Sequence, residues 1–378
     1  MKIAFVGKGG SGKTTLSSLF VRRLAAAGRP VLAVDADINQ HLGTALGLAE
    51  AQAEALPSMG AHLPQLKEYL RGDNPRIPDA ASMIKTTPPG RGSRLLRVVE
   101  DNPIYELCAR PLPIEHPVGA VEPRIMVTGA FTEEDLGVAC YHSKVGAVEL
   151  FLNHLVDGPE EYVVVDMTAG ADAFASGLFT RFDLTFLVSE PTRKGVSVYR
   201  QYREYAADFE VALAVVGNKL QGSEGGGAPT DADSEDMAFL REQVGSSLLT
   251  GFGLSEWVRR LEQGREPAFA ELAEREPENA RALDALLTAA DAAYGRRDWR
   301  RYTEQMVRIH LRNAAAWGND RAGDDLSAQI DPEFVLGETP AESPAGTSAG
   351  NPADATGAAR AEAAPVDGEH AMASAGVN

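Results

Sequence analysis

A glycine-rich loop near the amino terminus carries lysines and threonines at a spacing that suits phosphate chemistry. Residues 7–14 read GKGGSGKT and fit the pattern G-x-x-x-x-G-K-[ST]. In this pattern, glycines let successive backbone N–H groups point at phosphate oxygens, and the helix that follows adds its positive end. Lys13 would reach the β- and γ-phosphates, and Thr14 would place a hydroxyl on Mg²⁺. The nucleotide-binding residues predicted from this loop are Gly7, Lys8, Gly9, Gly10, Ser11, Gly12, Lys13, Thr14 and Thr15.

Three aspartates follow apolar runs that are typical of buried strands, and carboxylates at such places can hold Mg²⁺. Asp166 ends the run EYVVVD, where an acid would bind the ion directly or through water. Asp35 and Asp37 follow the apolar run at 31–34, and Asp35 would lie near the same ion. Each of them could instead cap the turn or helix that follows. Because ligands bind at the carboxyl ends of strands in open α/β sheets, these positions should share one edge of the sheet.

The elements that must position these residues alternate along the chain. Apolar runs are separated by amphipathic stretches, which predicts an α/β fold with a doubly wound, mainly parallel sheet and helices on both faces. The expected strands are residues 3–6, 31–34, 125–127, 162–165, 184–188, 211–216 and 246–250, with one more near 104–109. The expected helices are residues 13–28, 62–71, 143–156, 195–208, 235–244, 254–263, 277–294 and 298–316.

Composition divides the chain into an α/β domain and a C-terminal part. The domain spans 1–295 and contains an irregular insert at 45–123, which is rich in proline and small polar clusters. An accessory helix is expected at 296–320, where the run RRDWRRY (296–302) could dock DNA or a protein, bind an acidic tail, or form a solvated face. Residues 321–378 are rich in Ala, Gly, Pro, Ser and acids. They cannot bury enough apolar area to offset the ordering entropy, which predicts a disordered acidic tail.

Charge and cysteine content limit the partners. The chain has 54 acidic and 36 basic side chains, a formal net charge of −18. This excess argues against a nucleic-acid partner, since phosphate contacts need clustered Lys and Arg. No apolar run is long enough to span a membrane, and the first residues are typical of a strand rather than a signal peptide. Two cysteines suit a reducing compartment, so we expect a cytoplasmic protein without membrane contact.

A second lysine in the loop narrows the class. Lys8 follows the first glycine and gives KGGSGKT, which resembles the deviant Walker A loop of the MinD/ParA/nitrogenase iron-protein ATPases. The resemblance implies a homodimer formed on ATP, in which Lys8 crosses to the partner's nucleotide and, with Lys13, stabilises charge on the transferring phosphoryl group. It also implies that Asp37 orients the attacking water, that Gly170 meets the γ-phosphate, and that Asn218 reads adenine. Gly170 and Asn218 could equally be turn residues.

The run Cys140-Tyr141-His142 points to one branch of this class. The CooC-like ATPases, accessory proteins for nickel insertion into carbon monoxide dehydrogenase, carry a Cys-x-Cys pair at this place. By similarity Cys140 aligns with the first cysteine and His142 replaces the second; the stretches VVVDMTAG, SEPTRKGV and VVGNKL also match that branch. Two protomers could then complete a Cys₂His₂ site for Ni²⁺ or Zn²⁺. The alternative is a half-buried cysteine beside a surface histidine.

Other branches fit less well. An iron–sulfur cluster of the nitrogenase iron-protein kind needs a second cysteine where Ala173 stands, and Cys108 reads as an ordinary buried thiol. The C-terminal run HAMASAGVN is not the basic amphipathic helix of MinD-type proteins. Amidoligases that share this loop need a glutaminase domain, for which the tail leaves no room.

These observations together predict slow ATP hydrolysis, coupled to dimerisation, that drives maturation or metal loading of an unidentified client protein. The alternative is a ParA/MinD-like regulatory or partitioning switch, in which the nucleotide gates partner binding and no metal is involved.

Overall fold

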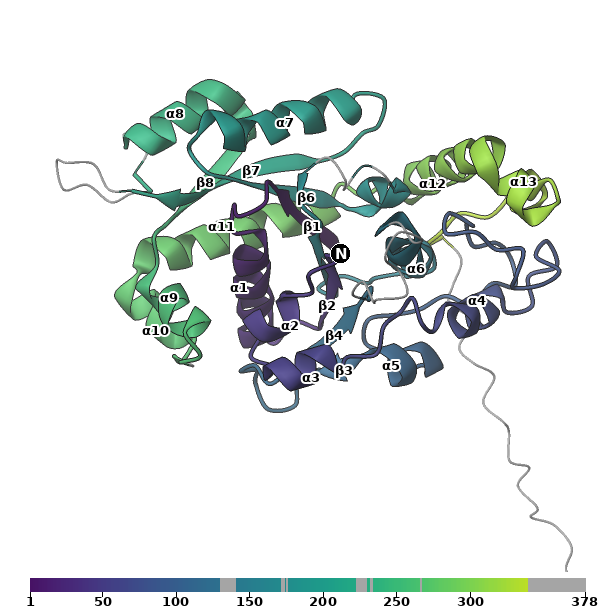
Figure 1. The fold of residues 1–378 in the computed structure, drawn as a ribbon, viewed down its shortest axis with the longest axis horizontal. Coiled ribbons are helices and arrows are strands. Elements are labelled where there is room, and N and C mark those ends of the chain that lie inside the picture. Colours follow the sequence, from purple (N-terminus) through teal and green to yellow (C-terminus); the bar gives the residue numbers. More distant parts are fainter. Residues whose placement is uncertain are drawn as a thin grey trace, which may run out of the picture. The chain divides into compact units, whose positions relative to one another are not determined.

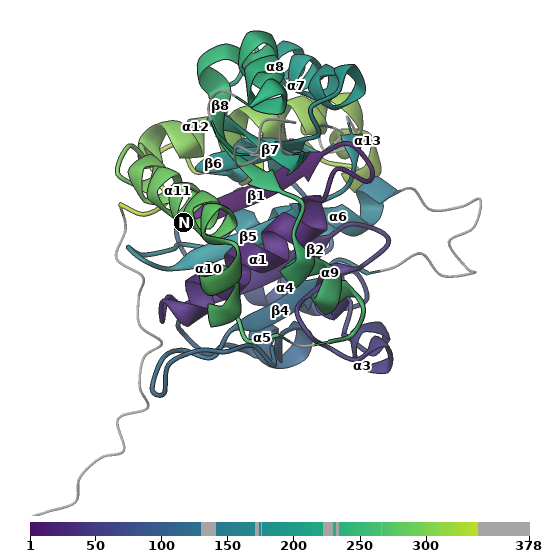
Figure 2. The same ribbon diagram turned by 90° about the vertical axis from the view of Figure 1, so that its left-hand side faces the viewer.

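A single sheet organises the computed structural model, which describes residues 1–129, 141–170, 174, 176–221, 230–231, 234–265 and 267–338. The described chain contributes eight strands in the spatial order β3-β4-β2-β5-β1-β6-β7-β8. Figure 1 labels all of them except β5, which is labelled in Figure 2. All neighbours are parallel except β3 and β4. The strands are β1 (Lys2–Gly7), β2 (Val31–Ala36), β3 (Arg110–Pro111), β4 (Arg124–Val127), β5 (Tyr162–Met167), β6 (Leu184–Ser189), β7 (Leu213–Leu220) and β8 (Leu248–Gly253). The predicted doubly wound, mainly parallel α/β fold is confirmed.

One face of the sheet is covered by helices from the first and the last part of the domain's sequence (Figure 2). The rings of Phe5 and Phe186 pack there against each other and against Phe20 of α1, with the three ring centroids 5.2 to 5.9 Å apart. The strands carry apolar side chains on this face and on the opposite one, as expected for a parallel sheet that helices cover on both faces. The helices on this face are α1 (Lys13–Ala26), α2 (Leu42–Ala45), α9 (Glu256–Glu262), α10 (Ala270–Arg275) and α11 (Pro277–Tyr294).

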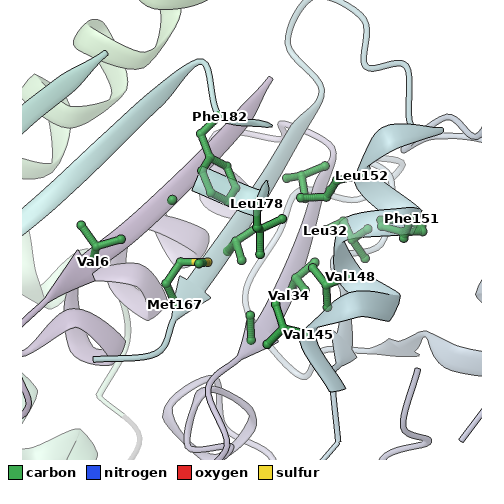
Figure 3. Packing of buried hydrophobic residues seen from close by; sticks show 14 of the residues in the cluster. Val6, Leu32, Val34, Val145, Val148, Phe151, Leu152, Met167, Leu178 and Phe182 are labelled. Carbon is green, nitrogen blue, oxygen red and sulfur yellow. The ribbon is translucent and has the colours of Figure 1, made fainter. Parts of the chain in front are cut away.

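The opposite face is packed by the insert and the middle of the chain. Figure 3 shows Val145, Val148 and Phe151 of α6 near Leu32 and Val34 of β2. The helices on this face are α4 (Leu63–Arg71), α5 (Pro103–Cys108), α6 (Tyr141–Asn153), the short helix η3 (Gly177–Arg181), α7 (Arg193–Tyr205) and α8 (Glu235–Val244). Among the described helices, none has the length and apolarity needed to cross a membrane.

The insert is more regular than its composition suggested. It contains α3 (Glu50–Glu54) and α4, which confirms the helix expected at 62–71. The strand predicted near 104–109 is wrong, because these residues form α5. Asn102 caps this helix by accepting hydrogen bonds from the backbone N–H groups of Ile104 and Tyr105, each at 3.0 Å, and Pro103 occupies its first turn.

The packed chain continues beyond the boundary predicted at residue 321. After α12 (Trp299–Asn313), η5 (Ala314–Gly318) and α13 (Asn319–Ala322), residues 326–338 run back along the insert, and we call them the C-terminal strap. Leu326, Phe334 and Leu336 of the strap are buried. The Nε of Arg91 donates to Asp331 at 2.7 Å, so the strap is also held to the insert by charge. Composition alone therefore did not predict that this part of the chain packs through three buried apolar residues and an ion pair.

One arginine of the run 296–302 does not face solvent. The Arg297 side chain is 4% exposed, pairs with Asp183, and lies 2.6 Å from Asp157. Its guanidinium also lies over the ring of Trp299, 4.4 Å from the centroid. Asp157 in turn accepts an ion pair from Lys2 of β1 at 3.2 Å. Arg297 therefore joins the α11–α12 connection to the first strand of the sheet, and is not available for docking.

Removing Arg297 should take away the ion-pair partner of buried Asp183 and one of the cationic partners of buried Asp157. We expect Arg297→Ala to lower the free energy of unfolding by about 3 to 5 kcal/mol, the usual effect of breaking a buried ion pair from one side. Urea denaturation would measure this. The exposed neighbour Arg296 offers a matched control, since Arg296→Ala should change stability by less than about 0.5 kcal/mol. Equal effects of the two substitutions would contradict the structural role of Arg297.

Candidate nucleotide site

The glycine loop connects β1 to α1 at the carboxyl edge of the sheet. Gly10 and Gly12 have positive φ angles of 80° and 93°, which side chains with a Cβ rarely adopt. A Cβ on Gly12 would also overlap the side-chain amide of Asn218. The loop thus needs glycine for conformation and for close packing, and α1 begins directly after it at Lys13. A helix start preceded by such a loop is a favourable place for an anion.

Two buried oxygens in this region have no hydrogen-bond partner among the described residues: Ser11 Oγ and Asp166 Oδ1. The other carboxylate oxygen of Asp166 accepts a hydrogen bond from the Thr14 hydroxyl at 2.6 Å. Burial raises the pKa of Asp166, and the nearby charge of Lys13, a residue that is 7% exposed, partly opposes that rise. An unengaged carboxylate oxygen beside a threonine hydroxyl is a suitable ligand pair for Mg²⁺. The residues present therefore fit both the ion and a phosphate group.

Strand register brings the aspartates together. Asp35 of β2 pairs directly with Asp166 of β5, and Asp166 lies opposite Phe5 of β1. Asp35 accepts hydrogen bonds from the backbone N–H groups of Asp37 and Leu42, at 3.1 and 2.9 Å. Its carboxylate therefore shapes the loop after β2 in the way a capping residue does. Its assignment as a Mg²⁺ ligand stays a prediction.

Asp37 lies further along the same loop and is 9% exposed. Its Oδ1 accepts hydrogen bonds from both the backbone and the side-chain nitrogen of Asn39, at 3.1 and 3.0 Å. These two contacts fix the direction of the carboxylate. Its proposed role in orienting water stays a prediction.

The ends of β6 and β7 brace the glycine loop, and sequence reasoning gave Lys219 and Glu190 no role in this. Asn218 donates its amide nitrogen to the carbonyl of Ser11 at 2.7 Å. Lys219 donates its ammonium group to the carbonyl of Gly10 at 2.6 Å and to Glu190 at 2.9 Å. Lys219 adopts a φ of 58°, a strained value for a non-glycine residue that tertiary contacts must hold in place. The bond to Ser11 uses one of the two N–H donors of the Asn218 amide, so its second N–H and its oxygen stay available to an adenine edge.

A cavity of about 940 Å³ opens beside the start of α1. Thr14 and Thr15 line it from α1, residues 39–41 line it from the loop after β2, and Glu262 lines it from α9. The Thr15 hydroxyl donates to Glu262 at 3.2 Å, which links α1 to α9 across the cavity. Its volume lies within the usual range for small-ligand sites, about 300 to 1,000 Å³. Ligand can therefore reach Thr14 from this side.

The remaining predicted residues are placed only in part. Lys8 is half-buried, Gly9 is exposed, and Gly170 follows β5 with a φ of 72°. Cys140 lies outside the described residues, and His142 lies in the first turn of α6 with its side chain undescribed. Among the side chains that the structure does describe, no group of three or more His, Cys, Asp or Glu could hold a metal ion. The proposed Cys140 and His142 site is thus untested.

Comparison with known proteins places the chain in a family. The sequence profile of the CobQ/CobB/MinD/ParA nucleotide binding domain matches residues 3–302, and the chain belongs to this family. It is 28% identical over 223 residues to an uncharacterized ATP-binding protein of Methanocaldococcus jannaschii, which covers 58% of this chain and 76% of that protein. It is also 28% identical over 221 residues to the carbon monoxide dehydrogenase accessory protein CooC of Rhodospirillum rubrum, covering 58% and 74%. The predicted resemblance to the MinD/ParA class and to CooC is confirmed.

Solved structures with a similar fold include two MinD proteins. The septum site-determining protein MinD of Pyrococcus horikoshii, complexed with Mg-ADP, aligns with a TM-score of 0.49 and 16% identity, covering 78% of this chain and 97% of that one. MinD of Aquifex aeolicus aligns with a TM-score of 0.46 and 16% identity, covering 79% and 98%.

Stability should depend on pH through Asp166. Burial raises the pKa of this carboxyl to about 7, against about 3.9 in an unfolded chain. The folded state therefore binds a proton that the unfolded state has lost, so Asp166 destabilises the fold increasingly between about pH 4 and pH 7, and constantly above. We expect Asp166→Asn to raise the melting temperature of the nucleotide-free, metal-free protein by an amount that grows from pH 5 to pH 7 and then levels off. A difference that is the same at every pH would contradict this.

The brace from Lys219 should matter for nucleotide affinity. Lys219→Met keeps the aliphatic stem but removes both hydrogen bonds, so we expect the dissociation constant for Mg²⁺-ATP to rise about tenfold. Glu190→Gln keeps the contact to Gly10 and should have a smaller effect. Lys194→Met, at an exposed lysine of α7, serves as a control. Equilibrium binding of a fluorescent ATP analogue measures all three, and an unchanged affinity in Lys219→Met would refute the brace.

Proposed function

We propose that the chain is an ATPase that binds Mg²⁺-ATP, pairs with a second copy while ATP is bound, and hydrolyses the nucleotide slowly to drive maturation or metal loading of a client protein. The observation that carries the ATPase part is the hydrogen bond between Thr14 and Asp166 beside the buried Lys13. It joins the glycine loop to an acid at the end of β5, and Asp166 still has a buried oxygen without a partner.

Each residue then has a chemical task. Thr14 and Asp166 would hold Mg²⁺, and the ion would stabilise negative charge on the phosphate oxygens. Lys13 stabilises charge on the phosphoryl group from within the same chain. Asp37, fixed by Asn39, orients the water that attacks the phosphorus atom. Lys8 is half-buried in the glycine loop, and in this proposal its ammonium group reaches the nucleotide bound by the paired copy.

The client step rests on similarity to the accessory protein CooC. A protein that prepares a metalloenzyme needs a place to hold the metal during the ATP cycle. Cys140 and His142 supply a thiolate and an imidazole, and two copies on a twofold axis would give four ligands, the number that Zn²⁺ takes in structural sites. Ni²⁺ or Zn²⁺ at a dimer interface is therefore the cargo we propose.

Native mass spectrometry of the Asp37→Ala variant tests the whole cycle. Because this variant lacks the residue that orients water, it should accumulate as a dimer with two ATP molecules when Mg²⁺-ATP is added. With Ni²⁺ or Zn²⁺ present, the dimer should carry one further metal ion. Adding Cys140→Ala and His142→Ala should abolish that ion and leave the dimer intact.

The buried thiol Cys108 offers a matched control. Burial raises the pKa of Cys108 to about 11, so it is a poor metal ligand, and Cys108→Ala should retain the ion. A dimer that holds ATP but never a metal would favour the regulatory switch instead. A protein that binds ATP but stays monomeric would refute the role given to Lys8.

A further inference from the structure

A second cavity, of about 410 Å³, lies between η3, the end of α7 and α12, and shares no lining residue with the nucleotide site. Aromatic rings form its wall. Phe174 packs against Phe179 and Tyr205, with ring centroids 4.8 and 5.5 Å apart, and Phe179 packs against Phe209 at 5.1 Å. Tyr205 is 49% exposed and marks the mouth. The wall is thus apolar and accessible from solvent.

One side of this cavity is tightly packed around Gly177. Gly177 lines it, and a Cβ at this position would overlap both Glu149 Oε1 and Ile309 Cγ2. Glu149 lies behind this side, fully buried on α6, and does not line the cavity. Ile309 of α12 is 4% exposed and completes the apolar surface. Gly177 and Ile309 therefore pack closely at this side of the cavity, and there is no room for a larger side chain at position 177.

Two of the polar side chains at the cavity, Arg312 and Ser176, can donate a hydrogen bond to a ligand. Arg312 is exposed, and within the described chain it forms no ion pair. Ser176 accepts a hydrogen bond from the backbone of Leu178 at 3.3 Å, so its hydroxyl proton is free to be donated. The amide of Asn313 is engaged with Ile309 and Trp317, at 3.0 and 3.1 Å.

No carboxylate occurs among the lining residues that the structure describes. The contrast with the rest of the chain is large, because acids outnumber bases by 54 to 36 overall. Among the described residues, the lining thus combines an aromatic wall with an unpaired guanidinium and holds no carboxylate, which favours an anion with an apolar body.

We propose that this cavity binds a small organic carboxylate, whose aromatic or branched aliphatic body lies against Phe174, Phe179 and Phe209 and whose charge pairs with Arg312. Its volume lies near the lower end of the range for small-molecule sites, about 300 to 1,000 Å³. The site is separate from the proposed ATPase function and does not depend on it.

Ligand-observed NMR titration of the full chain with 4-phenylbutyrate tests the site. The neutral alcohol 4-phenylbutanol has nearly the same body without the charge. We expect the acid to bind at least about tenfold more tightly than the alcohol, and Arg312→Ala to remove that difference by weakening only the acid. Arg312→Lys should restore part of the preference, since it keeps a positive charge.

Two further variants separate the cavity from general surface binding. Ala316→Trp places a large side chain at an exposed lining position and should block both ligands, while Arg321→Ala, at an exposed arginine outside the cavity, should leave both affinities unchanged. Thermal denaturation checks that each variant folds. Failure of the acid to bind, equal affinities in the native chain and Arg312→Ala, or undiminished binding to Ala316→Trp would each overturn the proposal. Mg²⁺-ATP binding measured alongside tests the ATPase separately.

Discussion

Two buried carboxylates face each other across the neighbouring strands β2 and β5, and much of the nucleotide site follows from this pairing. Asp35 and Asp166 are paired residues in the ladder, and burial raises the pKa of both. The charge of Asp166 raises the pKa of Asp35 further. The protein treats them differently. Asp35 is satisfied by two backbone N–H groups, which shapes the loop that carries Asp37. Asp166 receives one hydroxyl and keeps an oxygen unengaged, which makes it the acid that a cation would relieve.

The glycine loop is stabilised by the ends of β6 and β7, the two strands that follow β1 in the sheet. Its own residues supply few internal contacts, and several of its glycines adopt conformations with positive φ. Asn218 and Lys219 at the end of β7, with Glu190 beyond the end of β6, hold the carbonyls of Ser11 and Gly10. Because Asn218 and Lys219 donate hydrogen bonds to these carbonyls, the N–H groups of the loop can stay directed toward the position of a phosphate. The site is thus preorganised by three strand ends, β5, β6 and β7, in addition to the strand that carries the loop.

The parts of this molecule that sequence could predict are those set by local pattern. The loop motif, the apolar strands and the acids at their ends depend on short runs of residues, so the fold class and the positions of Asp35, Asp37 and Asp166 were accessible. The failures share a different cause. Residues 104–109 look strand-like by composition, yet the Asn102 cap and Pro103 start a helix. Arg297 and Lys219 look like surface charges, and only contacts with residues more than 100 positions away show otherwise.

The C-terminal strap has a consequence for how the protein is made. Arg91 in the insert pairs with Asp331, 240 residues later in the chain, and Thr87 donates to Gln329 at 3.0 Å. Contacts this distant in sequence form late, since the loop between them must close first. During synthesis, chains emerge from the amino end and fold in that order. The sheet can assemble around β1 while the insert still exposes the apolar surface that Leu326 and its neighbours later cover. A nascent chain of this protein therefore passes through a stage at which its nucleotide loop is already synthesised while the apolar surface of its insert is still exposed. A chaperone would bind to this exposed surface.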